Sequence, residues 1–223
     1  MKKGIVFSIV IFILFVCGLN NANAEVGIKA GLCIPNITLK GSYAPEGEWK
    51  SRYTGYGGGY FNFELSEIFD IQTEIHYSMK GARYLESIEY MGALCKIEFT
   101  AKHDYLEVPV LLMLNIAGKK IVPGIYAGPY GAFKIKSMGR TRTTVEDSEG
   151  NVLGEYEEEE MIDTIKDYDF GAVFGIEVKF IFENTKLILE SRYSLGLINL
   201  YIDPEGSNSI KNRAFVFMIG VGY

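Results

Sequence analysis

Apolar and polar side chains alternate with a period of two along most of the chain after residue 24. In the segment 71–80, alternate positions carry Ile71, Ile75 and Met79, and the intervening positions carry Gln, Glu, His, Ser and Lys. A β-strand between two unlike environments requires this alternation, because successive side chains point to opposite faces. No window after residue 24 approaches the roughly 18 apolar residues of a membrane-spanning helix. The pattern therefore predicts strands.

The same test predicts eight strands in the whole chain. They cover residues 25–36, 53–65, 70–81, 104–116, 121–136, 167–182, 186–198 and 213–223. Their connections alternate between long (37–52, 82–103, 137–166, 199–212) and short (66–69, 117–120, 183–185). Hairpins threaded through a membrane sort their connections in this way, with tight periplasmic turns and long outer loops. We expect an all-β fold, an eight-stranded antiparallel up-and-down transmembrane β-barrel that forms one domain over residues 25–223.

The two faces of the predicted strands indicate lipid outside and charge inside. Leu106, Val108, Phe215 and Phe217 belong to apolar faces about as tall as a hydrocarbon core. The opposite faces carry a lumen charge cluster: Glu74, Glu107, Glu177, Glu190, Arg192, Lys29, Lys80 and Lys179. An eight-stranded barrel has room for side chains but not for an open channel. We interpret the cluster as a structural plug of paired charges, with a gated or ligand-binding lumen as the alternative.

The first 24 residues have the order of a cleavable secretory signal. Two lysines precede the apolar run 5–19, and Ala22-Asn23-Ala24 follows it. Cleavage after Ala24 would change the net charge from −6 to −8, because the segment holds two lysines and no acid. The alternative is a lipoprotein cut before Cys17, but Val16 stands where a small residue belongs. The acidic mature chain argues against a nucleic-acid partner.

Several residues qualify this prediction. Pro109, Pro123 and Pro129 fall inside predicted strands and remove ladder donors, so we expect bulges or irregular pairing between strands 104–116 and 121–136. Cys33 and Cys95 could pair in an oxidising compartment, but the sequence does not place their sulfurs close together. The aromatic residues include 15 Tyr and 14 Phe against one Trp. Positions suited to girdles at the membrane interface hold Tyr77, Tyr193, Tyr201 and Tyr223.

Two motifs invite a chemical reading. His76-x-Ser78, with Glu74 before it, is similar to the His-x-Ser pair of some lipid-deacylating barrels. Strand neighbours two apart are about 6–7 Å from each other, beyond hydrogen-bond reach, and the pair is predicted to face the lumen. His103 lies beside Asp104 without a second metal ligand in sight. We therefore predict no enzyme, no cofactor and no metal.

The connection 137–166 is rich in carboxylates. It contains Glu146, Asp147, Glu149, Glu155, Glu157, Glu158, Glu159, Glu160 and Asp163. Such a density suits divalent cations or a basic partner, but the spacing matches no calcium-loop pattern. We interpret the segment as a solvated outer loop and leave cation binding open.

Five blocks resemble, in order, the PorT-like outer-membrane β-barrel family. They are residues 72–81 (QTEIHYSMKG), 105–112 (YLEVPVLL), 127–130 (AGPY), 169–175 (DFGAVFG) and 192–197 (RYSLGL). The resemblance covers about residues 25–223 and implies an eight-stranded outer-membrane barrel of a Gram-negative bacterium. The family carries prolines in two of these blocks, and the member that names it takes part in protein secretion. The C-terminal Tyr223 resembles the aromatic end that barrel-assembly machinery recognises.

The leading hypothesis is a non-enzymatic outer-membrane barrel that displays its extracellular loops for adhesion, envelope stability or attachment to a larger assembly. A component of a secretion or transport assembly, docked through its periplasmic turns or outer wall, is the second. A lipid-modifying barrel enzyme is the third. The expected partners are outer-membrane lipid, the assembly machinery and an envelope or secretion protein. A soluble lipocalin-like barrel is the alternative fold.

Overall fold

The computed structural model describes residues 24–41, 48–90, 92–116, 118–202 and 208–223. It contains eleven strands. They are β1 (Ala24–Lys40), β2 (Glu48–Lys50), β3 (Thr54–Glu64), β4 (Phe69–Lys80), β5 (Arg83–Tyr90), β6 (Ala93–Asn115), β7 (Ile121–Glu146), β8 (Val152–Met161), β9 (Tyr168–Phe182), β10 (Thr185–Gly196) and β11 (Ser209–Gly222). The predicted signal peptide lies outside the described residues except for Ala24, which begins β1.

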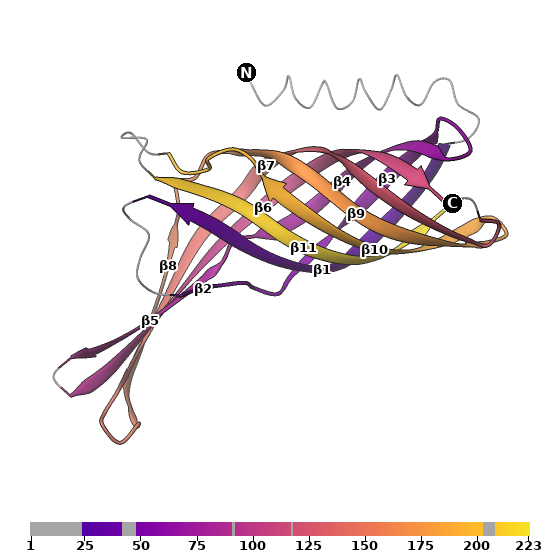
Figure 1. Ribbon diagram of the computed structural model, residues 1–223. Coiled ribbons are helices and arrows are strands. Elements are labelled where there is room, and N and C mark those ends of the chain that lie inside the picture. The colour runs from indigo at the N-terminus through magenta and orange to yellow at the C-terminus, as the bar shows by residue number, and fades with distance from the viewer. Residues whose placement is uncertain (1–23, 42–47, 91, 117, 203–207) are drawn as a thin grey trace.

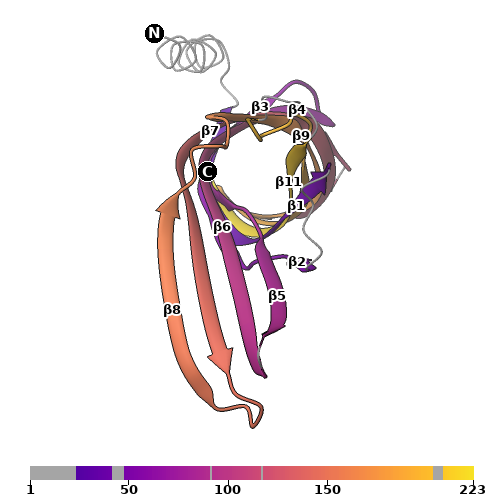
Figure 2. The ribbon, with the colours of Figure 1, turned by 90° about the vertical axis from the view of Figure 1, so that its left-hand side faces the viewer.

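Eight of these strands close into a ring (Figure 2). The order β6-β4-β3-β1-β11-β10-β9-β7 is completed by pairing of β6 with β7, and every pairing in the ring is antiparallel. The first and last strands meet over a long register, from Gly27 opposite Gly222 to Lys40 opposite Ser209. The predicted antiparallel fold with eight strands in the ring is confirmed. The short connections and the C-terminus lie at one end of the ring (Figure 1).

Two predicted loops are wrong. Most of 82–103 and of 137–166 is strand: β5 pairs with the first half of β6, and β8 pairs with the second half of β7. The strands β6 and β7 are 23 and 26 residues long, whereas a tilted strand crosses a bilayer in about 9–11 residues. The remaining residues of these two strands project from the ring, together with β5 and β8, as a twisted sheet (Figures 1 and 2). We call this sheet the fin and define it as residues 83–102 and 138–161 together with β2.

The predicted irregularity near the prolines is present. The register of β6 with β7 shifts between Asp104 and Tyr105, where β7 has one extra residue. The ladder between β4 and β6 is interrupted between Thr73 and His76, opposite Pro109, whose ring nitrogen has no hydrogen to donate. The shift at Asp104 also marks the place where the ring ends and the fin begins, in keeping with the tendency of bulges to bend strands.

The outer wall of the ring is apolar. Ile28 is 70% exposed, Leu112 54% and Phe217 48%. Of the predicted girdle tyrosines, Tyr193 packs between Phe174 and Phe215, with ring centroids 5.5 Å and 4.7 Å away. Among the described residues there is no helix long and apolar enough to cross a membrane. The ring therefore exposes hydrophobic side chains on its outside and encloses charged side chains in its interior.

Candidate functional site

The middle of the ring holds a network of buried charges centred on Arg192. Its guanidinium donates to both oxygens of Glu74, with Nη1 2.6 Å from Oε2 and Nη2 2.9 Å from Oε1. Its Nε donates to Oε1 of Glu190 at 2.6 Å. Lys29 Nζ lies 2.6 Å from the other oxygen of Glu190 and 3.1 Å from Oε1 of Glu74. Two cations and two carboxylates from β1, β4 and β10 thus satisfy one another.

Tyrosines tie this network to the wall. Tyr126 donates its hydroxyl to Glu190, and Tyr56 donates to Oε1 of Glu107 at 2.8 Å. Both rings also lie near the Arg192 guanidinium, whose carbon is 5.6 Å from the centroid of Tyr126 and 5.7 Å from that of Tyr56. Aromatic faces attract a guanidinium electrostatically. The side chains that fill the ring interior are therefore held from several strands at once.

A second cluster lies on the fin side of the network. Lys80 Nζ is 2.6 Å from Oε2 of Glu107 and 3.7 Å from Oδ2 of Asp169. The same Asp169 oxygen accepts from the Tyr130 hydroxyl at 3.1 Å and from the Asn212 amide at 3.0 Å. These residues come from β4, β6, β7, β9 and β11. The cluster therefore spans the interior.

A third cluster lies toward the short turns. Lys179 Nζ is 3.0 Å from Oε1 of Glu177 and 3.5 Å from Oδ2 of Asp70. Asp70 also accepts from the amides of Asn62 at 3.0 Å and Asn115 at 2.8 Å. With this cluster, all eight residues of the predicted lumen set lie inside the ring, each no more than 5% exposed.

Part of this site was not predicted from the sequence. Asp70, Asp169 and the tyrosines were not among the predicted lumen residues, although they are buried and bonded to that set. Asp70 shares the parity of Glu74 within one strand, so the alternation that located Glu74 also locates Asp70. The tyrosines gave no comparable signal, because Tyr occurs on both walls of the ring.

The predicted His-x-Ser pair is enclosed. His76 and Ser78 are both fully buried on the inner wall, and neither ring nitrogen of His76 nor the Ser78 hydroxyl has a hydrogen-bond partner among the described residues. His76 Nδ1 lies 3.3 Å from Oε2 of Glu74, an oxygen that Arg192 already engages. His103 is buried too, and its Nδ1 is 2.8 Å from the Ser137 hydroxyl. Cys33 and Cys95, the cysteines within the described residues, are free thiols.

The fin is the second candidate site, and one of its faces is a ladder of ion pairs. Across the strands, Arg83 pairs with Glu98, Lys96 with Glu146, Lys102 with Glu159, Arg140 with Glu157 and Arg142 with Glu155. We call this the charged face. Glu157 accepts hydrogen bonds from Arg140 and Arg142, which hold the pKa of its carboxyl below the usual value. Among the described residues no group of His, Cys, Asp and Glu could hold a metal ion.

The other face of the fin is largely apolar, and we call it the apolar face. The register places on it Trp49, Tyr84, Ile88, Cys95, Ile97, Phe99, Ala101, Gly139, Thr141, Thr143, Val145 and Tyr156, with Glu86, Glu158 and Glu160. Trp49 and Tyr84 have ring centroids 5.3 Å apart. Near the ring, Phe99 and Ile162 pack over Gly139. Farther out the face is open, since Ile88 is 44% exposed and Tyr156 69%.

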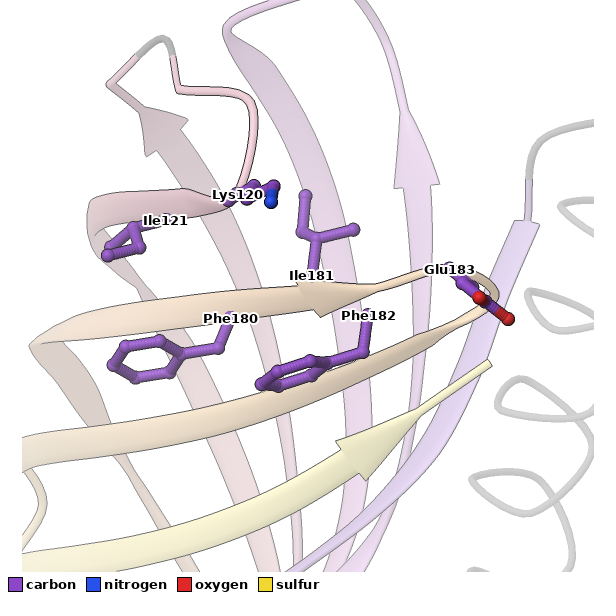
Figure 3. Close-up of a pocket in the computed structure, with 6 residues that line it drawn as sticks. All are labelled: Lys120, Ile121, Phe180, Ile181, Phe182 and Glu183. Atoms are coloured by element: carbon purple, nitrogen blue, oxygen red, sulfur yellow. The ribbon is translucent and has the colours of Figure 1, made fainter.

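At the opposite end of the molecule, a pocket lies against the short turns (Figure 3). Its volume is about 620 Å³, and it is lined by Lys120, Ile121, Phe180, Ile181, Phe182 and Glu183. The Phe180 and Phe182 rings point to one side of β9 and Ile181 to the other. Because Phe182 is 60% exposed and Phe180 shares its outward parity, this part of the pocket belongs to the apolar outer wall.

A closed antiparallel ring with an apolar exterior and a charged interior defines the outer-membrane β-barrel class of protein. The family model for the outer membrane protein beta-barrel domain matches residues 19–201. The chain belongs to this family. It is therefore an outer-membrane protein, and from here the ring is called the barrel.

Comparison with curated proteins found no match. Solved structures that resemble the chain include Ail, the attachment invasion locus protein of Yersinia pestis, at 10% identity and a TM-score of 0.40, covering 90% of this chain and 99% of that one. Neisserial surface protein A resembles it at 12% identity and a TM-score of 0.43, covering 89% and 95%. OprG from Pseudomonas aeruginosa does so at 13% identity and a TM-score of 0.40, covering 90% and 95%.

Proposed function

We propose that the protein is a non-enzymatic outer-membrane barrel with a plugged lumen, which presents the fin outside the cell as a platform for attachment to other molecules. The observation that carries the proposal is the sheet itself: two barrel strands extend far beyond the length that a bilayer requires and pair with β5 and β8. The fin adds a large surface without adding to the barrel core. Such a surface is suited to contact and not to transport.

The proposed plug rests on the buried ion pairs. An uncompensated charge in a narrow lumen is costly, so each cation here is held by at least one carboxylate within 3.1 Å. Side chains from strands that are not neighbours meet in these contacts. Lys29 of β1 reaches past β11 to Glu190 of β10, and Arg192 of β10 reaches Glu74 of β4 on the opposite wall. These bonds support a structural role for the predicted lumen set. A gated lumen would have to break several of them together.

The arrangement of the ends supports exposure of the fin to the outside. Exported barrels have short turns in the periplasm and long connections outside. The fin is at the end opposite the short turns and the C-terminus (Figure 1). In this proposal the signal segment 1–24 directs export, and the last strand, ending at Tyr223, is presented to the barrel-assembly machinery. Outer-membrane lipid covers the apolar wall.

Cysteine labelling tests the sidedness. In a Cys95→Ser background, Ser87→Cys on the fin and Asn184→Cys in a short turn each introduce an exposed thiol, while Cys33 is fully buried. A membrane-impermeant maleimide added to whole cells is expected to label Ser87→Cys at least ten times faster than Asn184→Cys. After lysis both positions should react. Labelling of Asn184→Cys alone in whole cells would reverse the proposed orientation and reject the platform.

Conductance tests the plug. The purified barrel in a planar bilayer is expected to give no sustained current, because the three charge clusters fill the interior. The double variant Lys29→Ala, Arg192→Ala removes the two central cations and serves as the opened comparison. A sustained single-channel current from the unmodified protein would support a pore and contradict the plug.

A role in a secretion or transport assembly is the second candidate. The favouring observation is the ordered set of blocks that resembles the PorT-like family. Such a role would use the short turns or the outer wall as docking surfaces, so stoichiometric recovery of a periplasmic partner from native membrane would favour it. A lipid-modifying enzyme receives less support, because His76 and Ser78 lie inside the barrel and away from acyl chains. Lipid deacylation by the unmodified protein, together with its loss in the Ser78→Ala variant, would support the enzyme instead.

A further inference from the structure

We propose that the apolar face of the fin is the docking surface for a protein partner that presents apolar side chains accompanied by lysine or arginine. This inference rests on the proposed function, since it names the partner chemistry of the platform. A sheet whose face is apolar is stabilised by covering that face with another layer. On this face Ile88 is 44% exposed and Tyr156 69%, although Ile162 covers the part nearest the barrel.

The charges of the fin are sorted between its faces. In β5 to β8, the register puts Arg83, Lys96, Lys102, Arg140 and Arg142 on the charged face, where each lies within 4.0 Å of a carboxylate. None of the described cations of these strands lies on the apolar face.

The carboxylates of the apolar face are Glu86, Glu158 and Glu160. Of these, Glu86 accepts a hydrogen bond from the Tyr84 hydroxyl. Glu158 and Glu160 stand exposed on the outermost strand, beside the apolar side chains. Within strands β5 to β8, the charges on the apolar face are therefore negative alone, and such a surface is complementary to a partner that adds positive charge to its apolar side chains.

The same distribution argues against a second copy of the chain. Two apolar faces packed on each other would bring the glutamates of both copies together, and like charges across an interface are costly. Additional strands on the free edge of β8 would meet Glu158 and Glu160 in the same way. A cationic partner replaces that repulsion with attraction.

The orientation of the fin argues against lipid as the occupant. Within β6, Phe99 and Ala101 have the same parity as Tyr105 and Glu107, and the strand contains no extra residue between them. The apolar face is thus the continuation of the inner wall, and the charged face is the continuation of the lipid-facing wall. Since the fin splays outward from the end of the barrel (Figures 1 and 2), the charged face looks toward the membrane surface and the apolar face away from it.

Site-specific photo-crosslinking in the native envelope tests this assignment. The full chain carries p-benzoylphenylalanine in place of Ile88 on the apolar face or, as the comparison, in place of Ser87 on the charged face. We expect position 88 to yield a protein adduct at least ten times more abundant than position 87. Mass spectrometry of the adduct should locate the crosslink in an apolar segment of another protein that also carries Lys or Arg.

Charge reversal completes the test. Glu158→Lys with Glu160→Lys should lower the adduct yield from position 88 at least ten-fold. The matched control, Glu67→Lys with Glu183→Lys, makes the same change of charge at exposed positions at the other end of the barrel and should leave the yield unchanged.

Absence of an adduct, an adduct with lipid or a second copy, or a yield insensitive to the fin reversal would overturn the proposal. Maleimide labelling of Ser87→Cys in whole cells distinguishes a wrong partner chemistry from a fin that does not lie outside the cell. If that thiol reacts in whole cells, the fin is outside and only the partner chemistry is wrong.

Discussion

Arg192 is the side chain on which the barrel interior depends most. It is 1% exposed and binds Glu74 with two nitrogens and Glu190 with a third, so its position is set by carboxylates from two strands. A buried ion pair contributes little net stability compared with an apolar pair of the same shape, but removal of one partner leaves the other charged and enclosed. The network therefore specifies how the interior is assembled more than it adds to stability.

Glu74→Gln is expected to lower the free energy of unfolding by about 3–5 kcal/mol, because Arg192 and Lys29 each lose a charged acceptor in the interior. Urea unfolding in lipid vesicles, followed by circular dichroism, measures the change. Glu67→Gln, exposed in a short turn, is the control and should have an effect near zero. Equal stability of the Glu74 variant and the parent would mean that the network does not restrain the interior.

Gly175 is a position where the barrel has no room for a side chain. A Cβ there would lie 2.5 Å from the backbone oxygen of Ser191 and 2.5 Å from the Tyr126 hydroxyl. Gly175→Ala is expected to destabilise the barrel by about 1–3 kcal/mol, since Tyr126 must shift away from Glu190. Gly131→Ala is a matched control in β7, because a Cβ at that residue meets nothing within 4 Å. The same unfolding measurement should separate the two variants, and equal losses would refute the packing argument.

At the scale of elements, the barrel strands were predictable and the fin was not. The predicted strands 70–81 and 186–198 differ from β4 and β10 by one or two residues at each end, because lipid on one side and charge on the other impose a strict alternation. In β8, five of the six residues from Glu155 to Glu160 are glutamates and the sixth is Tyr156, so no apolar alternation marks a strand. Its glutamates pair with cations of β7, as Glu157 does with Arg140 and Arg142. An alternation pattern within one segment does not reveal ion pairs between two segments.

The ion pairs of β7 and β8 predict a pH dependence of this hairpin. Since Glu157 has its pKa lowered in the folded state, its contribution to hairpin stability is fully present above the ordinary value of 4.5 and is lost as the pH falls below it. Hydrogen exchange of residues 138–161 should therefore accelerate below that pH, while the barrel strands stay protected. Glu157→Gln should flatten the dependence. Exchange that is independent of pH in the parent, after correction for intrinsic rates, would contradict this reading.

At the scale of the whole molecule, the barrel and the fin have separate sources of stability. The barrel closes through pairs that lie entirely within its eight strands, and the fin contributes no residue to the three lumen clusters. The sequence predicted which residues face the lumen because the alternation within each strand separates inward-facing from outward-facing side chains. It did not predict which of them would touch, because those contacts join strands that are far apart in the chain.

A variant with residues 83–102 and 138–161 each replaced by a short turn is expected to fold into a barrel. Heat-modifiable migration in detergent gels measures folding, and the finless variant should show it as the full chain does. This variant lacks the apolar face of the fin, so any protein partner that it still binds must contact the barrel wall or the short turns. Loss of heat-modifiable migration would show that the fin is needed to close the barrel.

The continuity of β6 and β7 also has a mechanical consequence. A strand of 26 residues extends roughly 80–90 Å, and it passes from the fin into the barrel without an intervening loop. A force applied at the fin tip is thus delivered to the barrel as bending of two paired strands, and the fin acts as a lever arm fixed at the bulge beside Asp104. A molecule held by the fin would be anchored to the membrane through a stiff arm and not through a flexible tether.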